Sequence, residues 1–341
     1  MELGIYTFVE NTPDAETGER AHPADRVELL MEEVELADKL GLDVFAIGEH
    51  HREEYVSSAP GVLLAAAAAR TQNIKLSSAV TVLGSDDPVR VYQQFSTLDL
   101  LSKGRAEIMV GRGSFVESFP LFGYDLQDYE ELFNEKLELL LKLQDNPTIT
   151  WEGKHRSSIN NRGVFPQPYK DKIPVWRAVG GTPKSAHQAG VNGMPMALAI
   201  IGGYPEQFKQ MADIHRRAAK ENGHAVPELS INSHGFIADT SQEAADTAFP
   251  AFKTVMDKLG EERGWPPMSR DQFDASITLR GANVVGSPQD IIDKIMFQHD
   301  IFGHDRFLLQ MSVGSIPREK LLRSIELFAT EVAPVIREKI G

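Results

Sequence analysis

The sequence predicts an α/β protein that forms a single (β/α)₈ TIM barrel over residues 1–341, with insertions after the fourth and seventh strands. Short apolar or β-branched segments alternate along the chain with longer segments of helical period, which is typical of a parallel sheet. Eight such units fit within the 341 residues, and no Pro- or Ser-rich linker divides them into two domains. The chain also contains no internal repeat or low-complexity tract.

Apolar periodicity and helix-capping residues give the expected order of the elements. The first helix carries apolar residues at i, i+3, i+4 and i+7 spacing and ends at Gly41. The second helix is rich in alanine, the third has Pro88 in its first turn, and the last presents one apolar stripe. The expected strands are 3–8, 43–47, 75–83, 105–110, 174–178, 194–200, 229–238 and 306–311. The expected helices are 27–40, 61–69, 88–102, 129–141, 183 onward, 205–222, 242–259, 287 onward and 317–339.

Two segments interrupt the alternation of strands and helices. Residues 146–172 are irregular and are expected to contain a β-hairpin. Residues 260–285 are polar and carry Arg263, Arg270 and Arg280. Long loops in compact domains are uncommon and often functional, so one interpretation of the second segment is a mobile lid over the site. The other interpretation is a surface insertion without a role.

Composition and charge exclude several classes of function. The 35 Lys and Arg against 49 Asp and Glu give a net charge of −14, which repels nucleic acid at long range. The absence of cysteine excludes disulfides, zinc ribbons and thiol nucleophiles. Residues 1–6 show no secretory signal, and the longest apolar run, 61–69, is too short to cross a bilayer. We therefore expect a cytoplasmic protein that binds a small molecule and neither nucleic acid nor a membrane.

Two adjacent histidines follow the second expected strand. Barrel enzymes carry their sites at the C-terminal ends of the strands, where His50 and His51 lie directly after Glu49. Neighbouring side chains on an extended segment point in different directions, so one histidine can face the barrel mouth and exchange protons near neutral pH. Two alternatives are a metal site, with Glu49 or His234 as the third ligand, and a purely structural histidine pair.

The turn after the fifth strand has the composition of a phosphate seat. A Gly-Gly pair leads into a helix with Thr182 at the N-cap and Pro183 at the first helical position, so free N–H groups and hydroxyls gather there. Arg112, between two glycines after the fourth strand, would balance the charge of a phosphate. The alternative is that Gly and Thr only cap the helix. Neither a G-x-G-x-x-G fingerprint nor a P-loop is present.

Taken together, these motifs resemble the luciferase-like flavin-dependent monooxygenases over almost the whole chain. The resemblance implies that Arg112, Thr182 and Ser185 hold the phosphate of FMN and that His50 is the active-site histidine. It also implies a non-prolyl cis peptide between Ala79 and Val80 beneath the isoalloxazine ring. The motifs that carry the resemblance are 49–51, 82–90, 101–105, 111–113, 180–185, 285–288 and the last helix. The cofactor-binding residues expected from it are Ala79, Val80, Thr81, Arg112, Gly180, Gly181, Thr182 and Ser185.

Two positions differ from the light-emitting members of that family. Gly111 replaces a reactive cysteine, and Gly181 replaces a glutamate beside the phosphate. The resemblance therefore implies flavin binding rather than light emission on a fatty aldehyde.

The resemblance implies an FMN-dependent monooxygenase that oxidises a small organic substrate with O₂ and reduced flavin, using His50 and His51 in catalysis and no metal. The eight units leave no segment for a nicotinamide domain, so we expect electrons from NAD(P)H to arrive through a separate flavin reductase. The other expected partner is a second copy of the chain, in a homodimer. The alternatives are hydride transfer with the deazaflavin F420, a flavin-binding protein without turnover, and a metal-dependent hydrolase.

Overall fold

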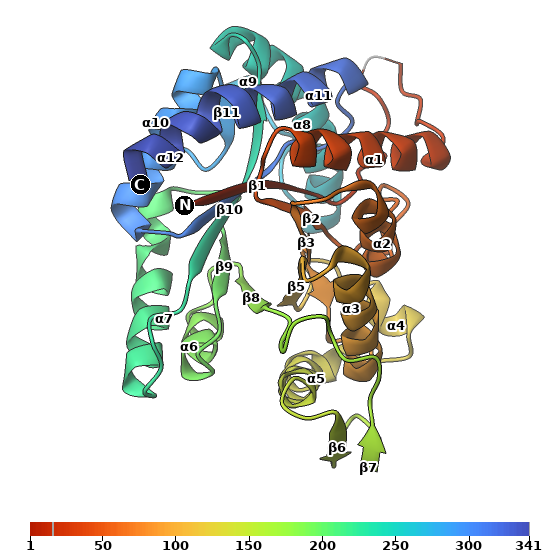
Figure 1. Cartoon of the computed structure of the whole chain (residues 1–341). Coiled ribbons are helices and arrows are strands. Elements are labelled where there is room, and N and C mark those ends of the chain that lie inside the picture. The colour runs from red at the N-terminus through yellow and green to blue at the C-terminus, as the bar shows by residue number, and fades with distance from the viewer. Residues whose placement is uncertain (16, 341) are drawn as a thin grey trace.

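A closed parallel barrel surrounded by helices forms the centre of the molecule (Figure 1). The computed structural model describes residues 1–15 and 17–340. The barrel closes because the last strand pairs in parallel with the first strand and with the seventh, so the predicted TIM barrel is confirmed. Its strands are β1 Glu2–Thr7, β2 Val44–Ile47, β3 Lys75–Ser78, β4 Thr81–Val82, β5 Ala106–Gly111, β8 Val175–Val179, β9 Met196–Ala199, β10 Leu229–Ile237 and β12 Arg306–Gln310.

The third barrel position differs from the single strand expected at 75–83. The peptide between Ala79 and Val80 is cis, as the resemblance implied, and it separates β3 from β4. Strand β3 pairs with β2, whereas β4 pairs only with β5, with Val82 opposite Gly111. The end of the third strand is therefore displaced toward the fourth strand, at the edge of the barrel where a site is expected.

The outer helices begin and end at capping residues. Asp87 accepts hydrogen bonds from the backbone N–H groups of Val89 and Arg90, and Ser287 forms a capping box with Asp290. The expected helix 205–222 begins as a short 3₁₀ segment, η2 Pro205–Phe208, and the last helix contains a π-helical turn, η3 Phe328–Val332. The α-helices of the barrel are α1 Pro23–Lys39, α2 Pro60–Arg70, α3 Pro88–Ser102, α5 Tyr129–Leu143, α6 Pro183–Val191, α7 Lys209–Glu221, α8 Ser241–Arg263, α10 Pro288–Phe302, α11 Arg318–Leu327 and α12 Ala333–Ile340.

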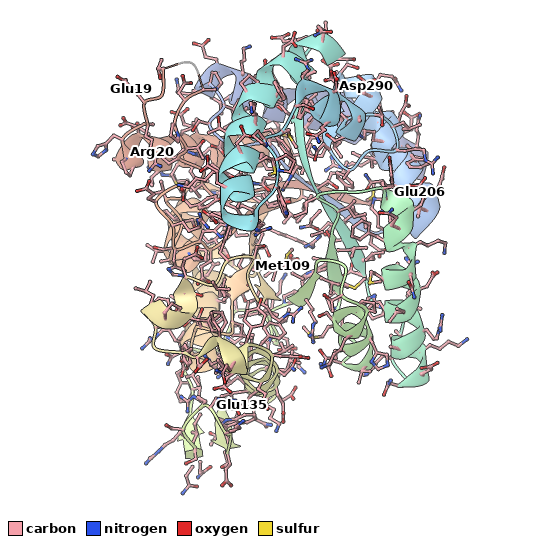
Figure 2. All side chains as sticks on the ribbon, turned by 180° about the vertical axis from the view of Figure 1, so that it is seen from behind. Glu19, Arg20, Met109, Glu135, Glu206 and Asp290 are labelled. Atoms are coloured by element: carbon pink, nitrogen blue, oxygen red, sulfur yellow. The ribbon has the colours of Figure 1, made fainter. Side chains whose placement is uncertain are left out.

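Two apolar layers hold the barrel together. One lies between the strands and the helices, and the other fills the barrel interior with alternate side chains of the same strands. Met109 of β5, labelled near the middle of Figure 2, belongs to the inner layer. Closer to the N-terminal ends of the strands, Arg306 donates to Glu107 at 2.7 and 3.0 Å and to Glu2 at 2.5 and 2.8 Å. Its guanidinium also stacks on Trp176, at 4.2 Å from the ring centroid. This network fills the N-terminal end of the barrel.

The insertion after the fourth strand contains the expected hairpin. After β5 the chain forms the short helix α4 Ser118–Leu121, the 3₁₀ turn η1 Leu126–Asp128 and α5, and then β6 Thr148–Trp151 pairs antiparallel with β7 Ile159–Gly163. The hairpin lies far from the barrel axis, below α5 in Figure 1. Glu135 of α5 anchors the hairpin by accepting hydrogen bonds from the backbone N–H groups of Lys154 at 2.7 Å and of Arg156 at 2.9 Å.

The insertion after the seventh strand is more ordered than the sequence suggested. Helix α8 continues to Arg263, and the segment that follows contains α9 Arg270–Ser276 and a short strand, β11 Val284–Gly286, which pairs with β10. Phe273 is fully buried in a separate apolar cluster with Phe252, at 5.6 Å between ring centroids. Arg280 forms an ion pair with Glu206, which Figure 2 labels, at 2.7 Å. The segment therefore packs against the barrel wall.

No helix within residues 1–15 and 17–340 combines the length and the apolar character needed to span a membrane.

Candidate active site

A cavity of about 400 Å³ lies at the C-terminal ends of the strands. Small-molecule sites occupy roughly 300–1,000 Å³, so this cavity can enclose a ligand. Its lining comes from strands β1, β5, β8, β9 and β10, from the segments that follow β1, β2, β5, β8 and β9, from the peptide between β3 and β4, and from the starts of α5 and α6. No described residue between 260 and 285 contributes. The lid interpretation of that segment therefore has no support in the lining of the cavity, while the expected position of the site agrees with the structure.

One end of the cavity collects anion-binding groups at the start of α6. Thr182 is the N-cap residue, yet its side chain makes no capping hydrogen bond. Ser185 lies in the first turn, and its Oγ is 3.5 Å from Nη2 of Arg112. All three side chains line the cavity. The positive end of α6, the uncommitted hydroxyl of Thr182 and the Ser185 hydroxyl beside the Arg112 guanidinium can together hold a dianion, so the helix-cap alternative does not account for Thr182.

The glycines of this turn have different surroundings. Gly180 lines the cavity, and a Cβ there would meet no atom within 4 Å, so the space beside it is open. Gly181 has φ of 102°, a conformation that favours glycine, but it does not line the cavity. Gly181 therefore shapes the turn, whereas Gly180 borders the space for a ligand.

A second arginine, Arg177, lies behind this end of the cavity on the outer side of β8, and it was not recognised from the sequence. Arg177 lies on β8, donates to Gln188 at 2.7 Å and leaves its buried Nε without a partner. Burial and, to a lesser extent, the neighbouring charge of Arg112 lower the pKa of Arg177 to about 10, and the more distant carboxylate of Glu130 opposes this shift. Within residues 1–15 and 17–340, neither arginine has a carboxylate within 4 Å. An arginine inside the apolar strand 175–179 was the signal that could have revealed this seat.

The middle of the cavity has a flat wall of backbone and small side chains. Ala79 and Val80 line it on either side of the cis peptide. A Cβ on Gly111 would come within 2.8 Å of the Val80 side chain, so only glycine fits there without displacing Val80. Thr81, expected with Ala79 and Val80, instead lines a smaller neighbouring pocket with His51. Thr81 directly follows Val80, and successive side chains of an extended segment face opposite sides, so the Thr81 side chain lies on the far side of the wall from Val80.

His50 faces the cavity, and His51 does not. His50 lies against Phe8 at 4.5 Å and Phe115 at 5.0 Å between ring centroids, and its buried Nε2 has no hydrogen-bond partner. Burial, with smaller contributions from His51 and Arg52, lowers the pKa of His50 to about 3, so the ring is neutral at pH 7. The resemblance named His50 rather than His51 as the active-site histidine, and the structure places His50, not His51, in the lining of the cavity.

His51 belongs instead to a small polar network behind the flat wall. Its Nε2 is 2.9 Å from Oε1 of Glu49, and the other oxygen of Glu49 accepts a hydrogen bond from the backbone N–H of Val82 at 2.8 Å. Glu49 therefore connects the segment after β2 with β4. His51 is therefore connected to the wall of the cavity through Glu49 rather than by lining the cavity itself.

The opposite side of the cavity carries two polar side chains on β10, Asn232 and His234. Burial lowers the pKa of His234 to about 4, and its Nδ1 has no partner. In the sequence analysis His234 entered only as a third metal ligand. A metal site needs three or more His, Asp or Glu side chains whose ligand atoms lie close together. Within residues 1–15 and 17–340, the only group of this kind consists of Asp128, Glu131 and His155. Neither Glu49 nor the histidine pair forms such a group with His234.

A closed barrel with an unpaired cationic seat and a flat cavity at its C-terminal end is the arrangement of a barrel enzyme that binds a flat, anionic small molecule. The sequence model of the family described as luciferase-like monooxygenase matches residues 1–304, so the chain belongs to that family. This match confirms the resemblance inferred from the sequence.

Individual relatives agree with the family. The chain is 23% identical to the oxygenase component of the flavin-dependent trigonelline monooxygenase of Acinetobacter baylyi, over 99% of this chain and 96% of that protein. The crystal structure of monooxygenase RslO1 from Streptomyces bottropensis is similar with a TM-score of 0.86 at 26% identity, over 98% of this chain and 99% of that one. An F420-dependent secondary alcohol dehydrogenase shares the fold with a TM-score of 0.77 at 18% identity, over 98% and 99% of the chains. With the family match, these findings indicate an oxidoreductase of the monooxygenase type; flavin and F420 are named for the relatives themselves.

Proposed function

We propose that this protein is an FMN-dependent monooxygenase that receives reduced FMN from a separate reductase and oxidises a small organic substrate with O₂. The observation that carries the proposal is the cationic seat: Arg112 lines the cavity beside the uncommitted hydroxyl of Thr182 and, among the described residues, has no carboxylate within 4 Å. Arg177 lies behind it on the outer side of β8, close enough for the two charges to act on each other. Two like charges in a partly buried place repel each other unless an anion neutralises them. The phosphate of FMN has the charge and size for this role.

The residues of the cavity fit the rest of the cofactor. The hydroxyls of Thr182 and Ser185 and the first N–H groups of α6 would bind phosphate oxygens. The isoalloxazine would lie against the peptide of Ala79 and Val80, where glycine at 111 leaves room. When bound, reduced FMN supplies the electrons that activate O₂ for transfer to the substrate.

The chain's own side chains would exclude water and move one proton. Tyr6, Phe8 and Met109 line the cavity and keep its interior apolar, which strengthens hydrogen bonds inside it. His50, neutral and with Nε2 unpartnered, can accept or donate a proton at that atom. Glu49 and His51 would fix the backbone that carries His50.

The source of electrons in this proposal is a partner protein. The barrel uses all eight units, and the cavity offers one cationic seat, whereas a dinucleotide would need a place for a second phosphate and its adenosine. The Acinetobacter relative is itself described as an oxygenase component. The homodimer and the cytoplasmic location expected from the sequence stay predictions.

A reconstitution experiment tests the proposal. The purified protein would be titrated with FMN and with F420, and reoxidation of reduced FMN by O₂ would be followed by stopped flow with and without a flavin reductase. We expect tight FMN binding, weak F420 binding and catalysis only when the reductase is present. Preference for F420 would assign hydride transfer instead. Rapid stoichiometric reduction of bound FMN by NADPH alone would remove the partner, and flavin binding without O₂-dependent product would remove the monooxygenase activity.

A further inference from the structure

The two sides of the cavity are chemically different. In the closed strand order, the cationic seat lies at β5 and β8, and the side across the barrel is formed by β10, β12, β1 and β2. If FMN is anchored by its phosphate at the seat, as proposed above, the space at β10 and β1 remains for the substrate. The following inference rests on the proposed function for this placement of the cofactor only.

Two hydrogen-bonding side chains on β10 face this remaining space. Asn232 and His234 are two positions apart on one strand, so their side chains lie on the same face, and both line the cavity. Oδ1 of Asn232 accepts a hydrogen bond from Ser230 at 2.8 Å, which leaves its NH₂ group to point away from Ser230. The buried Nδ1 of His234 has no partner. Buried polar groups without partners are uncommon in folded proteins, and a ligand is one means of satisfying them.

The same side of the cavity carries no free charge. Burial keeps His50 and His234 neutral by lowering each pKa, and it raises the pKa of Tyr6. Glu49 also lines the cavity, but hydrogen bonds from His51 and Val82 engage both of its oxygens. A charged substrate group placed here would lose its hydration without gaining a counter-ion, which is costly in a buried site.

We propose that the β10 side of the cavity is the substrate seat, in which the NH₂ group of Asn232 and the ring of His234 hold the carbonyl oxygen of a small, uncharged organic substrate. His50 then lies across the same space, close to the substrate. The seat selects against carboxylates and amines because it offers hydrogen bonds but no opposite charge. The cavity of about 400 Å³ is shared with the cofactor, so the substrate must be small.

Three probes of equal size test the charge selection. The FMN-loaded protein, labelled with ¹⁵N-histidine, would be titrated with cyclohexanone, cyclohexanecarboxylate and cyclohexylamine, and the ring signal of His234 would be followed by NMR. We expect saturable shifts with cyclohexanone and at least about tenfold weaker binding of the two charged probes. Equal or tighter binding of either charged probe would overturn the proposal.

Variants on β10 test the two residues. Asn232→Leu and His234→Gln are each expected to weaken cyclohexanone binding about tenfold, followed by ligand-observed NMR, while FMN affinity changes less than about twofold. Ser233→Ala is the matched control, because Ser233 is buried on the other face of the strand and its hydroxyl has no partner. Unchanged ketone affinity in both variants, or equal loss in the control, would contradict the assignment. A melting temperature within a few degrees of the parent shows that each variant folds.

The failure of this inference and the failure of the proposed function give different results. If the protein does not bind FMN, the FMN titration fails by itself. The cyclohexanone titration is then repeated on the unloaded protein, where a shift of the His234 signal that Asn232→Leu abolishes still supports the substrate seat. No shift in either form of the protein would reject the seat.

Discussion

The two ends of the barrel both contain buried arginines, but only one end satisfies them. At the N-terminal end, Arg306 donates to Glu107 and Glu2 and stacks on Trp176. At the C-terminal end, Arg112 and Arg177 have no carboxylate partner among the described residues. A paired buried charge is neutralised within the protein, whereas an unpaired one favours binding of an outside anion. The comparison separates residues that hold the fold from residues that would hold a ligand.

The largest expected effect concerns the N-terminal end of the barrel, where Arg306 is paired. Glu107→Ala removes the buried partner of Arg306 and leaves only the more exposed Glu2 beside the guanidinium. Removing one partner of a buried ion pair typically costs about 3–5 kcal/mol of stability. Unfolding by urea should show this loss, while FMN affinity of the folded fraction stays unchanged. The double variant Glu107→Leu with Arg306→Met should lose less than Glu107→Ala, because no charge is left unpaired. A single variant as stable as the parent would remove the structural role of the pair.

The next effect concerns the C-terminal end of the barrel and the rate of the proposed reaction. His50→Ala should lower turnover about a hundredfold, equivalent to roughly 2.7 kcal/mol, because it removes the proton-transferring group that faces the cavity. FMN affinity should remain nearly intact. His51→Ala is the control, and it should reduce turnover less because His51 acts only through Glu49. If His51→Ala is the more damaging change, the assignment of the inward-facing histidine is wrong.

The cationic seat gives the third prediction. Arg112→Ala should weaken FMN binding by about 1.5–3 kcal/mol, or ten- to a hundredfold, because a charge-assisted contact to phosphate is lost. The stability of the protein without flavin should change little, in contrast to the Glu107 variant. Arg162→Ala, on the exposed hairpin, serves as the control for a simple loss of positive charge. Unchanged affinity in a fluorescence titration would exclude Arg112 from the seat.

The smallest effect is a pH dependence of stability. His234 is neutral in the folded protein, with its pKa lowered from 6.5 to about 4, so below pH 6.5 the unfolded chain binds more protons than the folded one. Stability should therefore fall as the pH drops from about 6.5 toward 4, by about 1.4 kcal/mol per pH unit for each such histidine. His234→Phe should reduce this slope in urea unfolding at pH 6 and 5. His187→Phe, at an exposed position of α6, should leave it unchanged.

Local sequence patterns were sufficient for the fold and for one half of the site. The strands and helices follow from apolar periodicity and caps, and the seat at Thr182 follows from a Gly-Gly-Thr-Pro turn within six residues. These signals are contiguous in the chain, so they are visible before the barrel closes. The hairpin within 146–172 was predicted for the same reason.

The other half of the site could not be predicted, because it depends on which side of each strand faces inward. Asn232 and His234 lie within β10, and only the register of the closed barrel directs them toward the cavity. Arg177 lies within β8 but is directed to the outer side, against α5 and α6. The same uncertainty explains why Thr81 and His51 were assigned to the site although their side chains face the neighbouring pocket. A sequence shows that the side chains of a strand alternate between two faces, but only the tertiary structure decides which of the two sets faces the cavity.

In evolutionary terms, Glu49 makes one part of the barrel wall unusually easy to change. Backbone pairing between β2 and β3 ends at Ile47 and Ser78, and beyond it a side-chain oxygen of Glu49 accepts the N–H of Val82. Main-chain hydrogen bonds survive most substitutions, whereas this contact disappears with a single change of codon. Mutation at position 49 can therefore reposition the wall beside Ala79 and Val80 while the rest of the barrel keeps its register. A single substitution at position 49 is therefore a direct way for this protein to diverge toward other substrates.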